Sequence, residues 1–145
     1  MHRARTDDLS ARQLYALLRL RVDVFVVEQH CPYPELDGRD LEPTTRHLWL
    51  APPDDPERVL ACLRLLQEPD GTRRIGRVCT ARQERGRGLS RRLMEAALAE
   101  VGDAPAVLDA QVYVADFYAS FGFRVTGPEF LEDGIPHVEM RRPGR

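Results

Sequence analysis

The chain has 145 residues, of which 43% are hydrophobic and 30% charged, and its formal net charge is −2. This size and balance predict one soluble domain over residues 1–145 and exclude a disordered chain. No apolar run approaches the roughly 20 residues that span a bilayer, and the charged first ten residues do not resemble a secretion signal. We therefore expect a cytoplasmic protein without a membrane partner.

The first half of the chain predicts one helix, a long loop and three strands. Ser10 and Gln13 have the spacing of a capping box, and apolar residues at helical spacing follow, so we expect a helix from about Ala11 into the low twenties. The apolar run Phe25–Gln29 comes next, and residues 30–43, with three prolines, predict a long ordered loop or a broken helix. Segments rich in leucine, valine and isoleucine between turn signals predict adjacent strands at His47–Ala51, Val59–Gln67 and Arg73–Thr80.

The second half predicts a strand–helix–strand crossover. An amphipathic pattern runs from Leu89 to Val101 and stops at Gly102. A buried strand at Ala106–Ala110 follows, then a short aromatic helix that ends at Gly122. The last predicted strands are Phe123–Thr126 and His137–Arg141. Together the elements predict an α/β (α+β) fold: a mixed, mostly antiparallel sheet with a central parallel crossover and flanking helices.

The most informative stretch is Val78–Ser90, between a predicted strand and the start of a predicted helix. Gly86 and Gly88 let backbone amides approach an anion closely, and a helix N-terminus adds partial positive charge. A Rossmann loop would need a third glycine where Arg91 stands, and a P-loop would need a lysine, which the chain lacks because all 21 basic residues are arginine. The stretch therefore predicts an anion-binding loop of another kind.

Two motifs resemble those of the GCN5-related N-acetyltransferase (GNAT) superfamily. Residues Arg85-Gly86-Arg87-Gly88-Leu89-Ser90 resemble its Arg/Gln-x-x-Gly-x-Gly/Ala pyrophosphate loop, with serine in the last position. Gln111 and the run Phe117–Phe123 resemble its second signature, an aromatic helix that ends in Gly-Phe. Segments along nearly the whole chain resemble the ElaA-like acyltransferase subgroup: Leu20-Arg21, Val24–Gln29, Asp37, Arg46-His47 and Glu132–His137.

The resemblance implies acetyl-CoA as co-substrate, with no metal. It implies that the pyrophosphate binds the amides of Gly86 to Ser90, Leu89 included, with help from the side chains of Arg85 and Arg87. The backbone of Val78 and Thr80 is expected to pair with the pantetheine arm. Gln111 stands where asparagine is common in the family, and its amide is expected to bond the same arm.

Acyl transfer to an amine needs a proton donor and a proton acceptor. Tyr118 is the expected acid, because a phenol can protonate the departing coenzyme A thiolate. Glu28 closes an apolar run, so we expect it to be partly buried with a raised pKa and to serve as the base. His137 and His47 are the alternative bases. Phe25, Asp37 and His137 are expected on the acceptor side; Cys79 is expected to be a buried hydrophobe rather than an acylated nucleophile.

The function that this resemblance implies is a GNAT-type N-acetyltransferase that moves an acetyl group from acetyl-CoA to a primary amine by direct attack in a ternary complex. The acceptor class is a small-molecule or peptide amine, and the assembly state stays open between monomer and homodimer. One alternative is an enzyme like the acyl-homoserine lactone synthases. Another is a non-catalytic, arginine-rich module that binds nucleic acid or nucleotides, which the net charge of −2 disfavours, so we expect no nucleic-acid partner.

Overall fold

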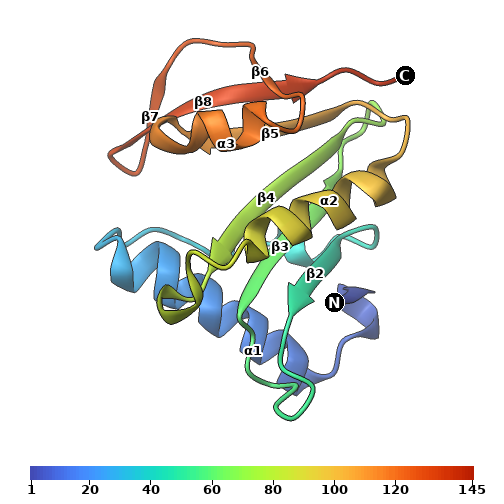
Figure 1. Ribbon diagram of the computed structural model, residues 1–145, viewed down its shortest axis with the longest axis vertical. Coiled ribbons are helices and arrows are strands. Elements are labelled where there is room, and N and C mark those ends of the chain that lie inside the picture. Colours follow the sequence, from blue (N-terminus) through green and yellow to red (C-terminus); the bar gives the residue numbers. More distant parts are fainter.

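The computed structural model describes residues 1–145 and is built on one eight-stranded sheet with the order β1-β2-β3-β4-β5-β8-β6, in which β7 pairs with β8 (Figure 1). The strands are β1 His2–Arg5, β2 Arg46–Leu50, β3 Ala61–Gln67, β4 Arg73–Thr80, β5 Ala106–Gln111, β6 Arg124–Val125, β7 Phe130–Glu132 and β8 Ile135–Arg142. Every pair is antiparallel except β4–β5. The predicted fold class, with one parallel crossover in a mostly antiparallel sheet, is confirmed.

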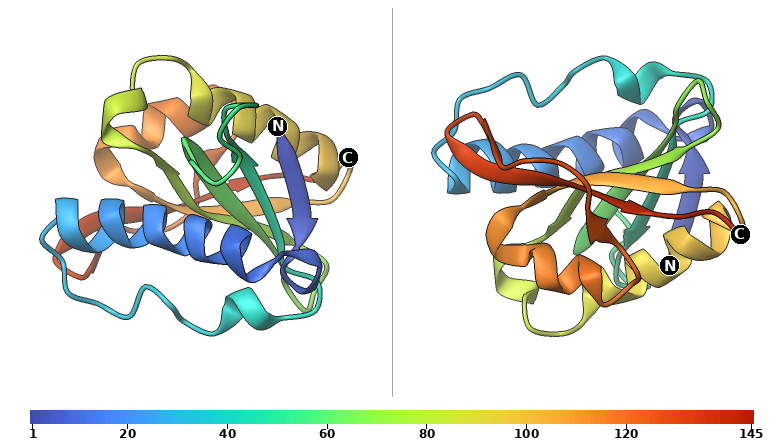
Figure 2. Two further views of the ribbon diagram at one scale, coloured as in Figure 1. Left: turned by 90° about the horizontal axis from the view of Figure 1, so that it is seen from below. Right: turned by 90° about the horizontal axis from the view of Figure 1, so that it is seen from above.

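Helices cover both faces of the sheet. The helices are α1 Ala11–Val22, α2 Leu89–Val101 and α3 Ala115–Ala119, with short turns η1 Thr6–Asp8, η2 Asp23–Glu28, η3 Arg39–Leu41, η4 Arg82–Glu84 and η5 Val112–Val114. The apolar stripe of α2 packs on one face in a core of 17 buried residues, and the stripe of α1 packs on the other face in a core of 7 (Figure 2). No helix combines the length and apolar composition needed to cross a membrane.

Helix α1 begins and ends where the sequence predicted. Ser10 Oγ accepts from the amide of Gln13 at 3.1 Å, and the Gln13 side chain accepts from the amide of Ser10 at 2.9 Å, which completes the capping box. After α1 the chain winds on as the π-helical η2, Asp23–Glu28. After η2 the chain follows residues 30–43 as a loop that η3 interrupts, and this loop lies beside α1 (Figure 2).

The sequence did not predict two of the strands. Strand β1 has the sequence His-Arg-Ala-Arg and forms because its backbone pairs with the edge of β2, not because of an apolar pattern. Strand β7 has three exposed residues and pairs with β8 through a tight turn at Asp133 and Gly134. Both are specified by the strand beside them, which short-range patterning does not report.

Strands β4 and β5 part after a short contact. They pair only at Arg73 with Ala106 and at Arg74 with Val107. Between the pairs Arg64–Gly76 and Cys62–Cys79, β4 holds one residue more than β3, which is a β-bulge, and Arg77 adopts a left-handed φ of 52° there. Beyond Arg74 the two strands are no longer paired, and Figure 1 shows β4 and β5 diverging.

Candidate active site

A cleft of about 960 Å³ occupies the opening between β4 and β5. Its lining comes from the carboxyl end of β4, the loop before α2, η5 and α3 on one side. On the other side the lining comes from η2, the loop after it and the turn between β7 and β8. The cleft contains every predicted site residue except Arg87 and His47, one of the two alternative bases. Segments distant in the sequence thus meet in one place, and no group of three histidine, cysteine or acidic side chains is placed there or elsewhere to hold a metal ion.

The loop before α2 presents free backbone amides to the cleft. Gly86 and Gly88 have φ values of 82° and 72°, and a Cβ atom at either position would meet no other atom within 4 Å. Helix α2 has no side-chain cap at Gly88, so its first amides have no partner within the helix. The Ser90 hydroxyl is bonded to the Thr80 hydroxyl at 2.8 Å. The loop therefore offers its amides and the positive end of α2 to an anion, as the sequence predicted.

The two loop arginines are paired with carboxylates. Arg85 donates from Nη1 and Nη2 to Glu28 at 2.6 and 2.8 Å, and from Nε and Nη2 to the Thr80 carbonyl at 3.2 Å. Arg87 is paired with Glu84. The Thr80 carbonyl expected to bind pantetheine is thus already an acceptor for Arg85.

Glu28 does not have the raised pKa that the sequence predicted. The hydrogen bonds from Arg85 lower the pKa of this carboxyl and outweigh the opposing effect of burial. The prediction was wrong because it counted the apolar run around Glu28 and not an arginine 57 positions away. An ion-paired carboxylate with a lowered pKa is a weak base.

Tyr118 lies on the face of the sheet that α2 covers. It packs against the larger core and edge-on to the ring of Phe117, with ring centroids 5.1 Å apart. Burial raises the pKa of Tyr118 to about 12, with the charges of Cys79 and Tyr113 acting in the same direction. The phenol is therefore protonated at neutral pH and lines the cleft as a proton donor.

The remaining predicted residues line the opposite side of the cleft. Gln111 accepts a hydrogen bond from the Tyr113 hydroxyl and donates weakly to Gln29 at 3.5 Å. Phe25 is half-buried and packs against the core beneath α1. His137 is nine-tenths buried, and its ring stacks on Phe130. Gln111 thus lies beside Gln29 and Tyr113, with His137 as its partner across the β5–β8 ladder.

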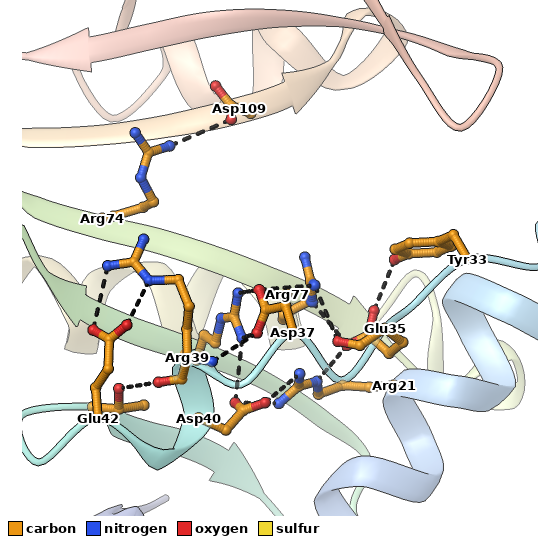
Figure 3. A network of polar contacts seen from close by, with 12 residues as sticks. Arg21, Tyr33, Glu35, Asp37, Arg39, Asp40, Glu42, Arg74, Arg77 and Asp109 are labelled. Carbon is orange, nitrogen blue, oxygen red and sulfur yellow. Dashed lines mark hydrogen bonds and ion pairs between the residues drawn. The ribbon is translucent and has the colours of Figure 1, made fainter.

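A buried ionic network that the sequence did not predict supports this wall (Figure 3). Arg21 of α1 donates to Glu35 at 2.7 Å and to both oxygens of Asp40 at 2.7 and 2.9 Å. Arg77, the bulge residue, donates to Glu35 at 2.8 Å. Arg21 falls on the buried face of an apolar helix, which is the one sequence signal for the network.

Asp37 and His47 belong to the same network. Arg64 donates to both oxygens of Asp37 at 2.9 and 2.7 Å, and these bonds hold the pKa of the carboxyl well below its usual range. Burial lowers the pKa of His47 to about 4, and its Nε2 lies 2.8 Å from the Thr6 hydroxyl. His47 is thus a neutral structural residue outside the cleft, and Asp37 is an anion on the cleft wall.

Comparison with known proteins places the whole chain. The family described as "Acetyltransferase (GNAT) domain" matches residues 22–143. A UPF0039 protein of Mycobacterium tuberculosis is 58% identical over 99% of this chain and 93% of its own length. Protein ElaA of Escherichia coli is 41% identical over 94% of this chain and 91% of its own length.

Solved structures agree with the sequence relatives. The crystal structure of an acyl-CoA N-acyltransferase from Pseudomonas aeruginosa has a TM-score of 0.91 and 43% identity, with 97% of each chain covered. The acyl-homoserine lactone synthase BjaI has a TM-score of 0.80 at 22% identity, with 99% of this chain and 82% of that chain covered, which is a likeness of fold alone. The family match, the relatives and the architecture of the cleft agree, and the chain belongs to the GNAT family of N-acetyltransferases, among the relatives of ElaA.

Proposed function

We propose that this protein transfers an acetyl group from acetyl-CoA to the amino group of a small-molecule or peptide acceptor. The single observation that carries the proposal is the cleft between β4 and β5, which has an amide-lined anion loop at one end and a buried phenol beside it. The acceptor amine attacks the thioester directly. Burial and the neighbouring Cys62 raise the pKa of Cys79 well above its ordinary value, which disfavours an acylated thiolate intermediate.

The proposed coenzyme A site runs from the anion loop along the edge of β4. The amides of Gly86 to Ser90 and the N-terminus of α2 bind the pyrophosphate. The backbone of Val78 and the amide of Thr80 remain for the pantetheine arm, because the Thr80 carbonyl accepts from Arg85. This alignment directs the thioester into the opening between the strands.

The proposed acid is Tyr118. When the tetrahedral intermediate collapses, the carbon–sulfur bond breaks and the thiolate takes the phenolic proton. A pKa of about 12 keeps this proton in place until a strong base such as the thiolate forms beside it. The charged groups around Asp37, Glu132 and Asp133 on the far wall suit an acceptor that arrives as an ammonium ion.

Calorimetry with acetyl-CoA tests the proposed site. Gly88→Val puts a branched side chain into the space above the loop, and we expect it to abolish measurable binding while the protein stays folded. The matched control is Gly71→Val in the β3–β4 turn, because Gly71 has a φ of 90°, faces open space and lies outside the cleft. The same backbone strain then affects both variants. Equal acetyl-CoA affinities for Gly88→Val and Gly71→Val would place the site elsewhere.

A panel of primary amines tests the reaction itself. Release of free coenzyme A thiol with a matching gain in acceptor mass is the expected result for at least one amine. Binding of acetyl-CoA without transfer to any amine would leave a coenzyme A-binding protein and contradict the proposed enzyme.

A further inference from the structure

We propose that His137 is the base that takes the proton from the acceptor amine and that its Nε2 is the atom that does so. The inference rests on the proposed function, because it names the acceptor-side partner of Tyr118 in the same cleft. Three observations carry it: the position of the ring relative to the sheet, the tautomer that its hydrogen bond fixes, and the charges beside it.

The position follows from alternation along β8. Val138 and Met140 belong to the core that α2 covers, so His137 faces the opposite side of the sheet. Tyr118 packs against that same core, on the side away from His137. The acid and the proposed base thus lie on opposite faces of the opening where the thioester carbon would sit. In this arrangement the amine attacks from the face of His137 and the thiolate leaves on the face of Tyr118, so each proton-transfer group lies on the side where it acts.

His137 and Tyr118 are also close along the cleft. His137 pairs directly with Gln111 across the β5–β8 ladder, which puts their side chains on one face as immediate neighbours. Gln111 is the last residue of β5, and Tyr118 lies on α3, which follows β5 after the short turn η5. The two proton-transfer groups therefore sit at the same carboxyl end of β5.

The tautomer follows from one hydrogen bond. His137 Nδ1 lies 2.7 Å from the carbonyl oxygen of Ile135. A carbonyl only accepts, so Nδ1 carries the proton and Nε2 keeps its lone pair. Stacking on Phe130, with ring centroids 5.8 Å apart, holds the ring in this orientation. The free nitrogen is the one a general base needs.

A carboxylate lies beside Nε2. Glu132 Oε2 lies 3.7 Å from Nε2, and the Glu132 side chain is 54% exposed, so it connects the ring to solvent. The other ionisable groups lining this part of the cleft are Asp133, Cys31, Tyr33 and Tyr113. Asp133 adds negative charge, and burial raises the pKa of the Cys31 thiol and of the Tyr33 phenol.

The proton balance closes with these two residues. The acceptor ammonium loses two protons as it becomes an amide. His137 takes one before the carbon–nitrogen bond forms and releases it to water past Glu132. Tyr118 gives its proton to the coenzyme A thiolate. The second proton of the amine leaves the nitrogen of the tetrahedral intermediate and replaces the one that Tyr118 has lost.

The test compares His137→Gln with His2→Gln, a histidine on β1 at the far edge of the sheet. On an amine that the wild-type enzyme acetylates, we expect His137→Gln to lower kcat/KM for the acceptor by about 10²–10⁴-fold at neutral pH. The acetyl-CoA affinity should stay within about twofold. The loss should shrink as pH rises, because the amine then deprotonates without help, and added imidazole should restore part of the rate in His137→Ala. The control should behave as wild type.

Four results would overturn the inference. Turnover that survives His137→Gln would refute it while leaving the proposed function intact, and a loss of equal size at every pH would point to a structural role. Nitrogen NMR of the wild-type ring that shows the proton on Nε2 would refute it independently of any acceptor. A wild-type protein that acetylates no amine would refute the proposed function and this base with it.

Discussion

Replacement of Arg21 by leucine tests whether the buried ionic network stabilises the fold around the loop after η2, which lines the proposed acceptor side of the cleft. Arg21 is 1% exposed, and its partners Glu35 and Asp40 are 2% and 9% exposed. The variant removes three hydrogen bonds to these carboxylates. Glu35 keeps its bonds from Arg77 and from the Tyr33 hydroxyl, and Asp40 keeps a contact with Arg64 at 3.4 Å. The change therefore leaves buried negative charge that is only partly compensated.

The expected loss in free energy of unfolding is large for one substitution. Removal of one partner of a buried pair destabilises a protein by about 3–5 kcal/mol. A domain near this size loses roughly 2–4 °C in Tm per kcal/mol, so Tm should fall by roughly 6–20 °C. The matched control is Arg19→Leu, an exposed position on the same helix, which should change stability by less than about 0.5 kcal/mol.

The pH dependence gives a second readout with a defined sign. Burial raises the pKa of Asp40, but the hydrogen bonds and charge of Arg21 outweigh this and leave the pKa below its ordinary value. A carboxyl with a depressed pKa in the folded state stabilises the protein above its unfolded pKa of about 3.9 and loses that contribution as pH falls through the folded value. The stability gap between wild type and Arg21→Leu should narrow below about pH 4. Equal melting temperatures for Arg21→Leu and Arg19→Leu would refute the reasoning.

Two further predictions concern the cleft. Tyr118→Phe keeps the ring and should lower kcat by roughly 10²–10⁴-fold with little change in acetyl-CoA affinity; near-normal turnover under conditions where chemistry limits the rate would assign the acid to another group. Glu28→Gln should keep kcat within a few-fold, because its carboxylate is tied to Arg85. A double-mutant cycle on Glu28 and Arg85 should give a coupling free energy below about 1 kcal/mol, since both side chains are partly exposed. If Glu28→Gln instead loses as much turnover as His137→Gln, the base is Glu28.

The parts of the site that were predictable from sequence depend on neighbours in the chain. The loop from Arg85 to Ser90 follows a strand and opens a helix, and its two glycines signal left-handed backbone, so its shape is encoded locally. The aromatic run that contains Tyr118 is also encoded locally: it lies on the short helix α3, and Gly122 follows with a left-handed φ. These elements formed where the sequence placed them.

The charge states of Glu28 and Asp37 depend on contacts with residues distant in the sequence, which no local pattern reports. Glu28 has an apolar sequence neighbourhood, but Arg85 lies across the fold and decides its pKa. Asp37 sits in an exposed loop, but Arg64 on the central strand β3 holds its carboxylate. Sequence reasoning could name the residue types that the chemistry needs, and only the folded arrangement assigns which of them is free to accept a proton.

The bulge at Arg77 is a local backbone feature that contacts with residues distant in the sequence stabilise. Left-handed backbone costs a residue other than glycine about 1–2 kcal/mol, and an arginine at this position gives no sequence signal for it. The side chain recovers this cost through Glu35 and through its position over the ring of Tyr33, 6.0 Å from the centroid. Because Glu35 also binds Arg21, one set of charges holds both the β4 bulge and the loop after η2. The proposed acetyl-CoA site along β4 and the proposed acceptor site against the loop therefore share one buried network.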